Sequence, residues 1–387
     1  MLGMDAFALP EDLEQFRKLV REICEDRLAP RAAEIDEQDE FPWDIHRLFV
    51  ENELMGVGYP EEHGGAGGGS LTMAVMVEEI ARVSASASLI PLVNRLGAIP
   101  VMLAGSDEQK TELFGGISRG EHQMSYGLTE PGAGSDAASL QTRYEATGGG
   151  FRINGTKRFI TGAGASDRYT VFATKDPSLR SKGISAFVVH GDDPGFSVGK
   201  SEKKLGIRGS PTRELYLDNV EVPRDRLLGE GGQGFAYAMR TLDYSRPTIA
   251  AQALGIAQGA FDVAARYMTE REQFGQKIAE FQGLQFMLAD MAMQIEAARL
   301  LTYRAASATD AKDPKMTYHA AVAKAHASDT AMSVTTDAVQ ILGGYGYMRE
   351  YGVERMMRDA KITQIYEGTN QVQRIVIARQ VLRGLAG

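Results

Sequence analysis

Ile365-Tyr366-Glu367-Gly368-Thr369-Asn370-Gln371 is the stretch that joins the last two predicted helices of the chain. The first of these helices is expected to end near residue 358. The second is expected to span about 371–383, where apolar residues recur at three- and four-residue steps. Thr369 or Asn370 can cap this helix, and Gly384 can end it. Glu367 is therefore predicted to lie just before a helix N-terminus, beside a glycine that lets a ligand approach the backbone.

A carboxylate in this position experiences two opposed effects. The helix dipole favours its ionised form, whereas burial against apolar groups raises its pKa. A general base that acts once substrate has excluded water would use both effects. An acidic residue near a helix start is also common in proteins without a catalytic role, so this interpretation depends on other stretches of the chain.

The composition is typical of a globular protein with a large core. The chain has 387 residues, of which 43% are hydrophobic and 24% charged, enough for about two or three domains. The formal net charge of -9 argues against nucleic acid as the main partner. Cys24 is the only cysteine, which argues against a disulfide and fits the cytoplasm, where we expect the protein.

The sequence also gives no indication of a signal peptide, a membrane-spanning segment or a metal site. The first residues lack the apolar centre of a signal peptide, and no apolar run is expected to reach membrane-spanning length. The six histidines are scattered without a ligand spacing, so no metal site is predicted. No G-x-S-x-G supports a serine nucleophile.

The patterning predicts an α+β protein with domains at 1–121, 122–234 and 235–387. The first domain is expected to be helical. The second has β-rich runs at 126–128, 151–153, 169–173, 184–189, 196–198 and 215–217. Because no helical pattern separates these runs, we predict an antiparallel sheet or barrel, with turns at 154–155, 192–195 and 218–219. No glycine fingerprint of a Rossmann fold follows a strand.

The third domain is predicted to be helical. Helical patterns cover 248–268, 282–306 and 315–342, besides the helix at the C-terminus. Pro247 suits the first position of a helix.

Four further stretches could carry chemistry. Residues 126–136 leave a strand and enter a glycine-rich turn, which suits a planar heterocycle with a phosphate nearby but is also compatible with a plain turn. Residues 159–162 offer an aromatic face beside a hydroxyl. Residues 271–275 and 340–346 combine an arginine, amides and glycines that suit a diphosphate. Asp243 and Arg246 form an ion pair at helical spacing, which alone would be interpreted as a surface pair.

Together these stretches resemble the acyl-CoA dehydrogenase family. The family's motifs occur in its order and spacing: YGLTEPGAGSD at 126–136, FITG at 159–162, TLDYSR at 241–246, REQFGQ at 271–276, QILGGYG at 340–346 and IYEGTNQVQR at 365–374. The resemblance covers nearly the whole chain and is closest to bacterial short- and medium-chain members. It implies a helical N-terminal domain, a middle β-domain and a C-terminal four-helix domain. It also implies one FAD per subunit, a homotetramer built as a dimer of dimers, and electron-transfer flavoprotein as the electron acceptor.

The resemblance also implies the site residues. Contacts with FAD in the same subunit are implied for Tyr126, Leu128, Thr129, Ser135, Phe159, Thr161, Thr369 and Gln371. Contacts with the FAD of a neighbouring subunit are implied for Arg271, Gln273, Phe274, Gln340, Gly343 and Gly344, and Gln282 is also assigned to the cofactor. Contacts with substrate are implied for Ser135, Asp243, Arg246, Tyr366 and Gly368.

The reaction implied by the resemblance is α,β-dehydrogenation of an acyl-CoA thioester. Glu367 takes the α-proton, and a hydride leaves the β-carbon for flavin N5, which gives a trans-2-enoyl-CoA. The thioester oxygen is stabilised by a ribityl hydroxyl of FAD and by the backbone N–H of Glu367. Alternatives on the same fold are an acyl-CoA oxidase and an enoyl-CoA reductase. From another class, the alternative is an inactive helical binding protein.

Two features leave the substrate and the electron acceptor open. Many relatives carry tryptophan where this chain has Phe159, near the exit of electrons from the flavin. Ser88, Leu92, Asn94 and Arg95 align with the far end of the acyl pocket. Arg95 could pair with an ω-carboxylate, or it could be a surface or interface arginine, because an unpaired buried charge is costly. The acyl group is expected to be short, medium or branched.

Overall fold

The computed structural model describes residues 8–385 and begins with a group of packed helices. These are α1 (Glu11–Ile23), α2 (Ala32–Gln38), α3 (Trp43–Glu51), α4 (Ser70–Val83), α5 (Ala85–Ala104) and α6 (Asp107–Ser118). Helix α5 begins where the Ser84 hydroxyl accepts a hydrogen bond from Ala87 N at 3.3 Å, and α6 begins with a capping box between Ser106 and Gln109. The predicted helical start of the chain is confirmed.

Helix α5 is the most apolar helix of this group. By length and composition it could cross a membrane, yet 78% of its apolar window is buried inside the fold. The prediction that no apolar run reaches this length is therefore wrong. In this structure, α5 is a core helix that contacts α7 and β1.

The middle of the chain forms a seven-stranded sheet. Its strands are β1 (Met124–Gly127), β2 (Arg143–Ala146), β3 (Gly150–Thr161), β4 (Arg168–Thr174), β5 (Ile184–His190), β6 (Phe196–Val198) and β7 (Thr212–Pro223). The order is β1-β4-β2-β3-β7-β6, and β5 pairs with β4. Most pairs are antiparallel, as predicted, but β1 and β2 pair with β4 in parallel. A parallel pair needs a crossover connection, and strand patterns in the sequence do not reveal it.

Two predicted turns lie inside strands. Asn154 and Gly155 fall in β3, and Asp218 and Asn219 fall in β7, so both turn predictions are wrong. The register of the two strands shifts between Ile153 and Gly155. Asn219 has φ 54°, and its N–H donates to Asn154 Oδ1 at 2.8 Å. Residues that favour turns are here used to form a bulge in a pair of long strands.

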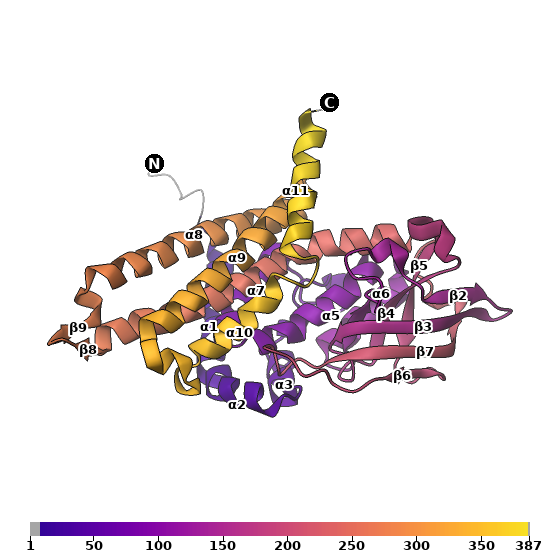
Figure 1. Ribbon diagram of the computed structural model, residues 1–387. Coiled ribbons are helices and arrows are strands. Elements are labelled where there is room, and N and C mark those ends of the chain that lie inside the picture. The colour runs from indigo at the N-terminus through magenta and orange to yellow at the C-terminus, as the bar shows by residue number, and fades with distance from the viewer. Residues whose placement is uncertain (1–7, 386–387) are drawn as a thin grey trace.

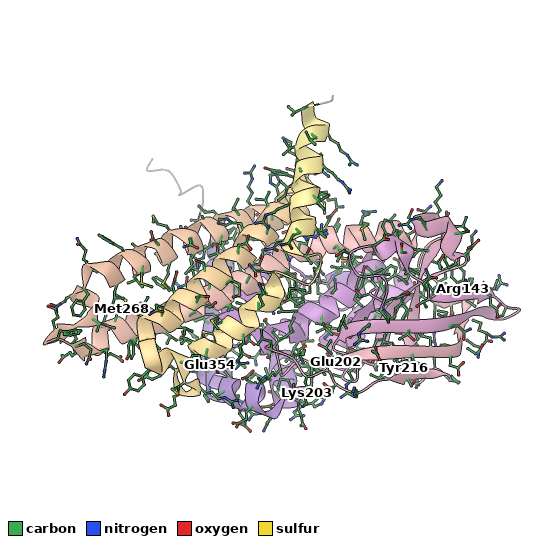
Figure 2. The ribbon with its side chains drawn as sticks, viewed as in Figure 1. Arg143, Glu202, Lys203, Tyr216, Met268 and Glu354 are labelled. Atoms are coloured by element: carbon green, nitrogen blue, oxygen red, sulfur yellow. The ribbon has the colours of Figure 1, made fainter. Side chains whose placement is uncertain are left out.

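The last part of the chain is helical again. Its elements are α7 (Gly234–Glu270), the small hairpin β8 (Glu272–Gln273) and β9 (Gln276–Lys277), α8 (Gln282–Asp310), α9 (Met316–Leu342), α10 (Val353–Thr363) and α11 (Asn370–Leu385). Helix α7 packs against α8, α9 and α10, in agreement with the predicted bundle. It extends from the sheet to the hairpin (Figure 1). Figure 2 shows Met268 of α7 and Arg143 of β2 at opposite ends of the molecule.

Three helix limits differ from the prediction. Pro247 lies inside α7 and does not begin a helix, α10 continues to Thr363, and Gly384 lies inside α11. Helix α11 contacts α9 at its base and projects away from the body (Figure 1). Its apolar residues Ile375 and Leu382 are 49% and 63% exposed. The domain limits at 121/122 and 234/235 stay predictions.

Candidate active site

Glu367 lies in the turn between α10 and α11. The turn places Glu367 at φ 52° and Gly368 at φ 89°, both in the left-handed region. This conformation is easy for glycine but unfavourable for glutamate. The Oγ1 atom of Thr369 accepts a hydrogen bond from Val372 N at 3.3 Å, so Thr369 caps α11 as predicted.

The carboxylate of Glu367 points back onto α7. It is half-buried, and its Oε2 atom accepts a hydrogen bond from the Ser245 hydroxyl. Burial raises the pKa of Glu367 to about 7, although the Ser245 hydrogen bond and the charges of Arg246 and Lys324 lower it. A carboxyl group of this pKa can accept a proton near neutral pH and hold it.

Asp243 and Arg246 form an ion pair beside Glu367. Arg246 is 5% exposed, its Nη1 lies 2.8 Å from Asp243 Oδ1, and its Nε donates to the Glu367 carbonyl at 3.4 Å. Thr317 of α9 donates to Asp243 Oδ2 at 2.7 Å. The pair is therefore buried at the turn, and its interpretation as a surface pair is wrong.

Tyr126 at the end of β1 lies near this group. Its hydroxyl donates to the Ala238 carbonyl of α7 at 3.4 Å, and its ring lies 5.1 Å from that of Phe172, edge to face. Burial raises the pKa of Tyr126 well above its usual value, and the charge of Glu367 adds to this. The end of β1 and the Glu367 turn thus meet on the same part of α7.

The end of β3 carries a surface with an exposed aromatic ring beside the end of β1. The Arg158 N–H donates to the Thr129 carbonyl at 2.9 Å, and the Ser125 hydroxyl donates to the Thr161 carbonyl at 2.7 Å. Phe159 is 58% exposed and has φ 58°, while Leu128 is buried behind the strands. An exposed aromatic ring is therefore available beside the hydrogen-bonded backbone of β1 and β3. An aromatic ring suits the face of an isoalloxazine ring.

The glycine-rich turn after β1 is open. An added Cβ at Gly132 or Gly134 would meet nothing within 4 Å, and Ser135 is exposed. A ligand with phosphates could approach the backbone of this turn without displacing a side chain.

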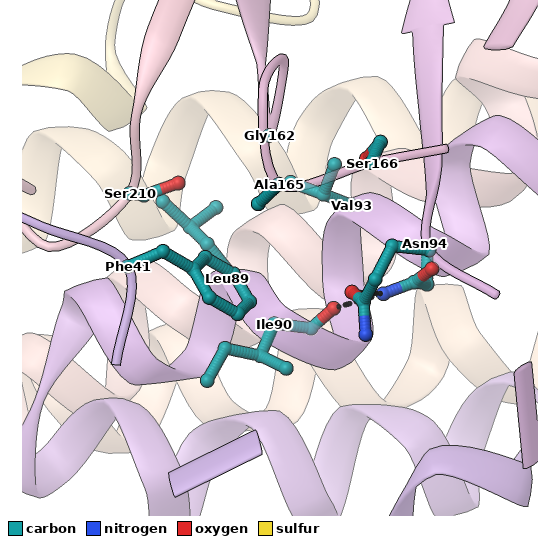
Figure 3. Close-up of a pocket in the computed structure, with 10 residues that line it drawn as sticks. Phe41, Leu89, Ile90, Val93, Asn94, Gly162, Ala165, Ser166 and Ser210 are labelled. Atoms are coloured by element: carbon teal, nitrogen blue, oxygen red, sulfur yellow. Dashed lines mark hydrogen bonds between the residues drawn. The ribbon is translucent and has the colours of Figure 1, made fainter. Parts of the chain in front are cut away.

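A small pocket lies behind this surface, between α5 and the turn after β3 (Figure 3). Its lining includes Val93, Gly162 and Ser166, and Asn94 donates to Gln123 Oε1 at 2.7 Å and to the Ile90 carbonyl at 2.8 Å. The cavity of about 10 Å³ holds at most about one water molecule. It is too small for substrate, and it marks close packing between the helices and the sheet.

The motifs at 271–275 and 340–346 lie near each other, at the end of the helical part that is away from the sheet. The Arg271 guanidinium lies 5.6 Å from the Tyr345 ring centroid, which joins the β8–β9 hairpin to the end of α9. Phe274 is 95% exposed, and Gln273, Gln282, Gln340, Gly343 and Gly344 are exposed as well. The hairpin lies far from the sheet (Figure 1), so these residues do not join Glu367 within one chain. Gln371 is exposed at the start of α11.

The residues proposed for the acyl pocket are packed inside the helices. Arg95 is 9% exposed, and its Nη1 donates to the Gly58 carbonyl beside the Tyr59 ring, so the surface position is wrong. Leu92 and Asn94 are buried too. Gln252 Nε2 donates to the Ser88 hydroxyl at 3.0 Å, and the Tyr366 hydroxyl donates to Gln252 Oε1.

Sequence reasoning missed several residues at this site. Ser245 stands inside the motif 241–246, between the two residues that were singled out. Lys324 of α9 and Gln373 of α11 bond to the carbonyls of the Glu367 turn, and nothing in their local sequence marks them. Only the packing of α9 against the turn reveals their position.

Comparison with known proteins agrees with these observations. Models of the acyl-CoA dehydrogenase N-terminal, middle and C-terminal domains match residues 10–121, 125–220 and 232–382. The chain is 52% identical over 381 residues to the probable acyl-CoA dehydrogenase FadE25 of Mycobacterium tuberculosis, which covers 98% of each chain.

Two solved structures are also similar. Butyryl-CoA dehydrogenase from Megasphaera elsdenii has a TM-score of 0.94 and 44% identity, covering 98% of this chain and 100% of that one. A chain described under "Electron transferring flavoprotein of Acidaminococcus fermentans: Towards a mechanism of flavin-based electron bifurcation" has a TM-score of 0.95 and 47% identity, with the same coverage. The chain belongs to the acyl-CoA dehydrogenase family, whose members are FAD-dependent oxidoreductases.

Proposed function

We propose that the protein dehydrogenates an acyl-CoA thioester at its α and β carbons, with Glu367 as the base. The observation that carries this proposal is the Glu367 carboxylate itself. It is half-buried, points onto α7 near Tyr126, and has a pKa raised to about 7. A thioester α-proton is weakly acidic, so its removal needs a base of matched pKa and a donor at the thioester oxygen.

The residues of this chain have separate tasks in the proposed reaction. Glu367 takes the α-proton, and its backbone N–H donates to the thioester oxygen. Ser245 holds the carboxylate in place, while Tyr366 and Gly368 border the acyl group. Asp243 and Arg246, together with Ser135, lie on the CoA side. The half-buried position of Glu367 means that a bound thioester would exclude remaining water, which strengthens these interactions.

FAD, when bound, accepts the hydride that leaves the β-carbon at its N5 atom, and the product is a trans-2-enoyl-CoA. We assign Tyr126, Leu128, Thr129, Phe159 and Thr161 to the ring, and Ser135, Thr369 and Gln371 to the rest of the cofactor. The exposed ring of Phe159 and the open glycines at 132 and 134 support this assignment.

The residues of the motifs at 271–275 and 340–346 support a homotetramer. The β8–β9 hairpin, the start of α8 and the end of α9 lie at the end of the helical part away from the sheet (Figure 1). In and beside these elements are Arg271, Gln273, Phe274, Gln282, Gln340, Gly343 and Gly344. We propose that they reach the FAD of a neighbouring subunit. The exposure of Phe274 at 95% and of Leu382 at 63% supports burial of these residues against further copies of the chain.

For the substrate we propose a short acyl-CoA. The interior behind Tyr366 is filled by Gln252 and Ser88: Gln252 donates to the Ser88 hydroxyl and accepts from the Tyr366 hydroxyl. The 44% identity to a butyryl-CoA dehydrogenase supports the same length. For the electron acceptor we propose electron-transfer flavoprotein, which is supported by the likeness to the Acidaminococcus fermentans structure. The compartment that we propose is the cytoplasm, where a free buried thiol such as Cys24 stays reduced.

An anaerobic titration of the purified flavoprotein with acyl-CoAs of increasing length tests this function. Bleaching of the flavin absorbance by butyryl-CoA is expected for the wild type. The Glu367→Gln variant should bind butyryl-CoA without bleaching. Bleaching by none of the acyl-CoAs would contradict the proposal, and peroxide formed with substrate under air would indicate an oxidase.

A further inference from the structure

Lys324 in the middle of α9 is buried behind the Glu367 turn. It is 0% exposed, and its Nζ donates to the Gly368 carbonyl at 2.8 Å and to Asn370 Oδ1 at 3.0 Å. We infer that Lys324 is a positioning residue for Glu367, which fixes the turn that carries the base and places a positive charge behind its carboxylate. This inference rests on the proposed function.

The turn needs support from outside because its backbone is unfavourable. A non-glycine residue with positive φ, such as Glu367 at 52°, persists only where its surroundings hold it. The Gly368 carbonyl accepts from Lys324 at 2.8 Å and from Gln373 Nε2 at 2.9 Å. The Glu367 carbonyl accepts from Gln373 at 3.2 Å and from Arg246 Nε at 3.4 Å. Both carbonyls of the turn are therefore held by side chains of three helices.

Holding Asn370 in place does not require an ammonium group. The Asn370 side chain also bonds to the Ser328 hydroxyl at 2.9 Å and to Asp329 Oδ1 at 2.7 Å. A neutral donor could likewise serve the Gly368 carbonyl, as Gln373 does. A buried lysine is costly unless its charge has a partner. The partners of the Lys324 Nζ are the Gly368 carbonyl and Asn370 Oδ1, and the charge of Glu367 favours the ionised form of Lys324.

The charges around Lys324 and Glu367 determine in which direction each group shifts the pKa of the other. Lys324 is influenced by Glu367, Arg246 and Asp329, and burial lowers the pKa of Lys324 to about 7 while the charge of Glu367 raises it. The positive charge of Lys324 lowers the pKa of Glu367, in the same direction as the Ser245 hydrogen bond and the Arg246 charge. Loss of the Lys324 charge should therefore raise the pKa of Glu367.

Two tyrosines complete the surroundings of Glu367. Tyr126 approaches from β1 and Tyr366 lies in the same turn, and burial raises the pKa of both hydroxyls well above the usual value. Both are therefore neutral in the pH range of interest.

The test compares Lys324→Gln with Gln373→Leu in the FAD-loaded enzyme. Lys324→Gln keeps a donor for the Gly368 carbonyl but removes the charge, whereas Gln373→Leu removes a neutral donor. The kcat and KM for butyryl-CoA are measured from pH 6 to 9, with flavin content and the thermal midpoint as checks on folding. Lys324→Gln should move the acid limb of kcat upward by about one pH unit, which is about a tenfold loss of kcat on that limb. Its KM should change by less than about threefold, because the proposed role concerns the base and not CoA binding. Gln373→Leu should lower kcat without moving the limb.

If kcat of Lys324→Gln falls on the acid side at the same pH as kcat of the wild type, the inference is overturned. Lys324 would then have only a structural role. Lys324→Arg, which keeps the charge, should restore the wild-type limb even if its kcat is reduced. If Lys324→Gln fails to fold, the limb of Lys324→Met, which also removes the charge, decides in the same way. Failure of the proposed function is distinguished by Glu367→Gln: if that variant still bleaches with substrate, the base itself has been assigned wrongly.

Discussion

Ser245 of α7 donates a hydrogen bond to the Glu367 carboxylate, although the two residues are 122 positions apart in the chain. The general base proposed for this enzyme is therefore oriented by a long core helix and not only by its own strained turn. Arg246, the next residue of α7, reaches the Glu367 carbonyl. Ser245 and Arg246, which are neighbours on α7, thus donate to the carboxylate and to the backbone carbonyl of Glu367.

Removal of the Ser245 hydroxyl should raise the pKa of Glu367 further, since this hydrogen bond stabilises the ionised form. In Ser245→Ala, the acid limb of kcat should move upward by up to about one pH unit. Activity at pH 6 should fall about tenfold and should approach the wild-type value at pH 9. Thr335→Val, which removes a buried hydroxyl of α9 that bonds only within its own helix, is the matched control for general loss of packing. Equal losses at both pH values would contradict the expected effect.

Substrate turnover should depend on the ionisation of Glu367 in the free enzyme. The pKa of about 7 predicts that kcat/KM falls tenfold per pH unit well below pH 7 and levels off above it.

The raised pKa of Glu367 also makes the stability of the fold depend on pH. Burial raises the pKa in the folded state above its unfolded value, so the folded state binds more protons and loses stability as pH rises from about 4.5 to 7.

Glu367→Gln should relieve this loss of stability. The variant should be more stable than the wild type at pH 8, by on the order of 1–3 kcal/mol, and the difference should shrink toward pH 5. Unfolding by urea at both pH values measures this effect. A variant that is less stable than the wild type at pH 8 would show that the carboxylate is well solvated or fully paired.

The Asp243–Arg246 pair should matter for folding because both partners are largely buried at the turn. Arg246→Met leaves Asp243 without its charged partner, and the free energy of unfolding should fall by about 3–5 kcal/mol. Asp243→Asn in the same chain should recover part of that loss, which a double-mutant cycle measures. Additive losses would indicate that the two side chains do not interact.

Phe159 should matter for the cofactor and little for the fold. Its ring is 58% exposed and its φ of 58° is unfavourable for a bulky residue. Phe159→Gly should therefore unfold within about 1 kcal/mol of the wild type in the FAD-free form. Its FAD should dissociate more readily, as measured by flavin fluorescence on dilution. Phe196→Gly, at a partly buried phenylalanine packed against the sheet core, is the control that should lower stability.

The sequence indicates the element types well where local chemistry decides them. The helices predicted at 282–306 and 315–342 and the cap at Thr369 appear in the structure as expected. Turn residues at 154–155 and 218–219 were misleading, because the same residues also favour a bulge between two long strands. Pro247 was misleading in the same manner, because packing can keep a proline inside a helix of 37 residues.

In the candidate site, too, some residues are marked by their local sequence and others are brought in only by tertiary packing. Glu367 could be singled out from its own stretch, since glycine and a helix start mark that position. Ser245, Lys324 and Gln373 could not, because they meet Glu367 only through the packing of α7, α9 and α11. Burial of Arg95 was also hidden, since its partner is the Gly58 carbonyl of a distant loop.

The most direct test of Glu367 as the base is exchange of the substrate α-hydrogens. FAD-loaded wild type and Glu367→Gln are incubated with butyryl-CoA in D₂O without an electron acceptor, and deuterium at the α-carbon of recovered butyryl-CoA is measured by mass spectrometry. We predict incorporation with the wild type, and incorporation reduced by about 10²–10⁴-fold with Glu367→Gln, even where binding is saturated. Incorporation by Glu367→Gln at the wild-type rate would contradict the assignment of Glu367 as the base.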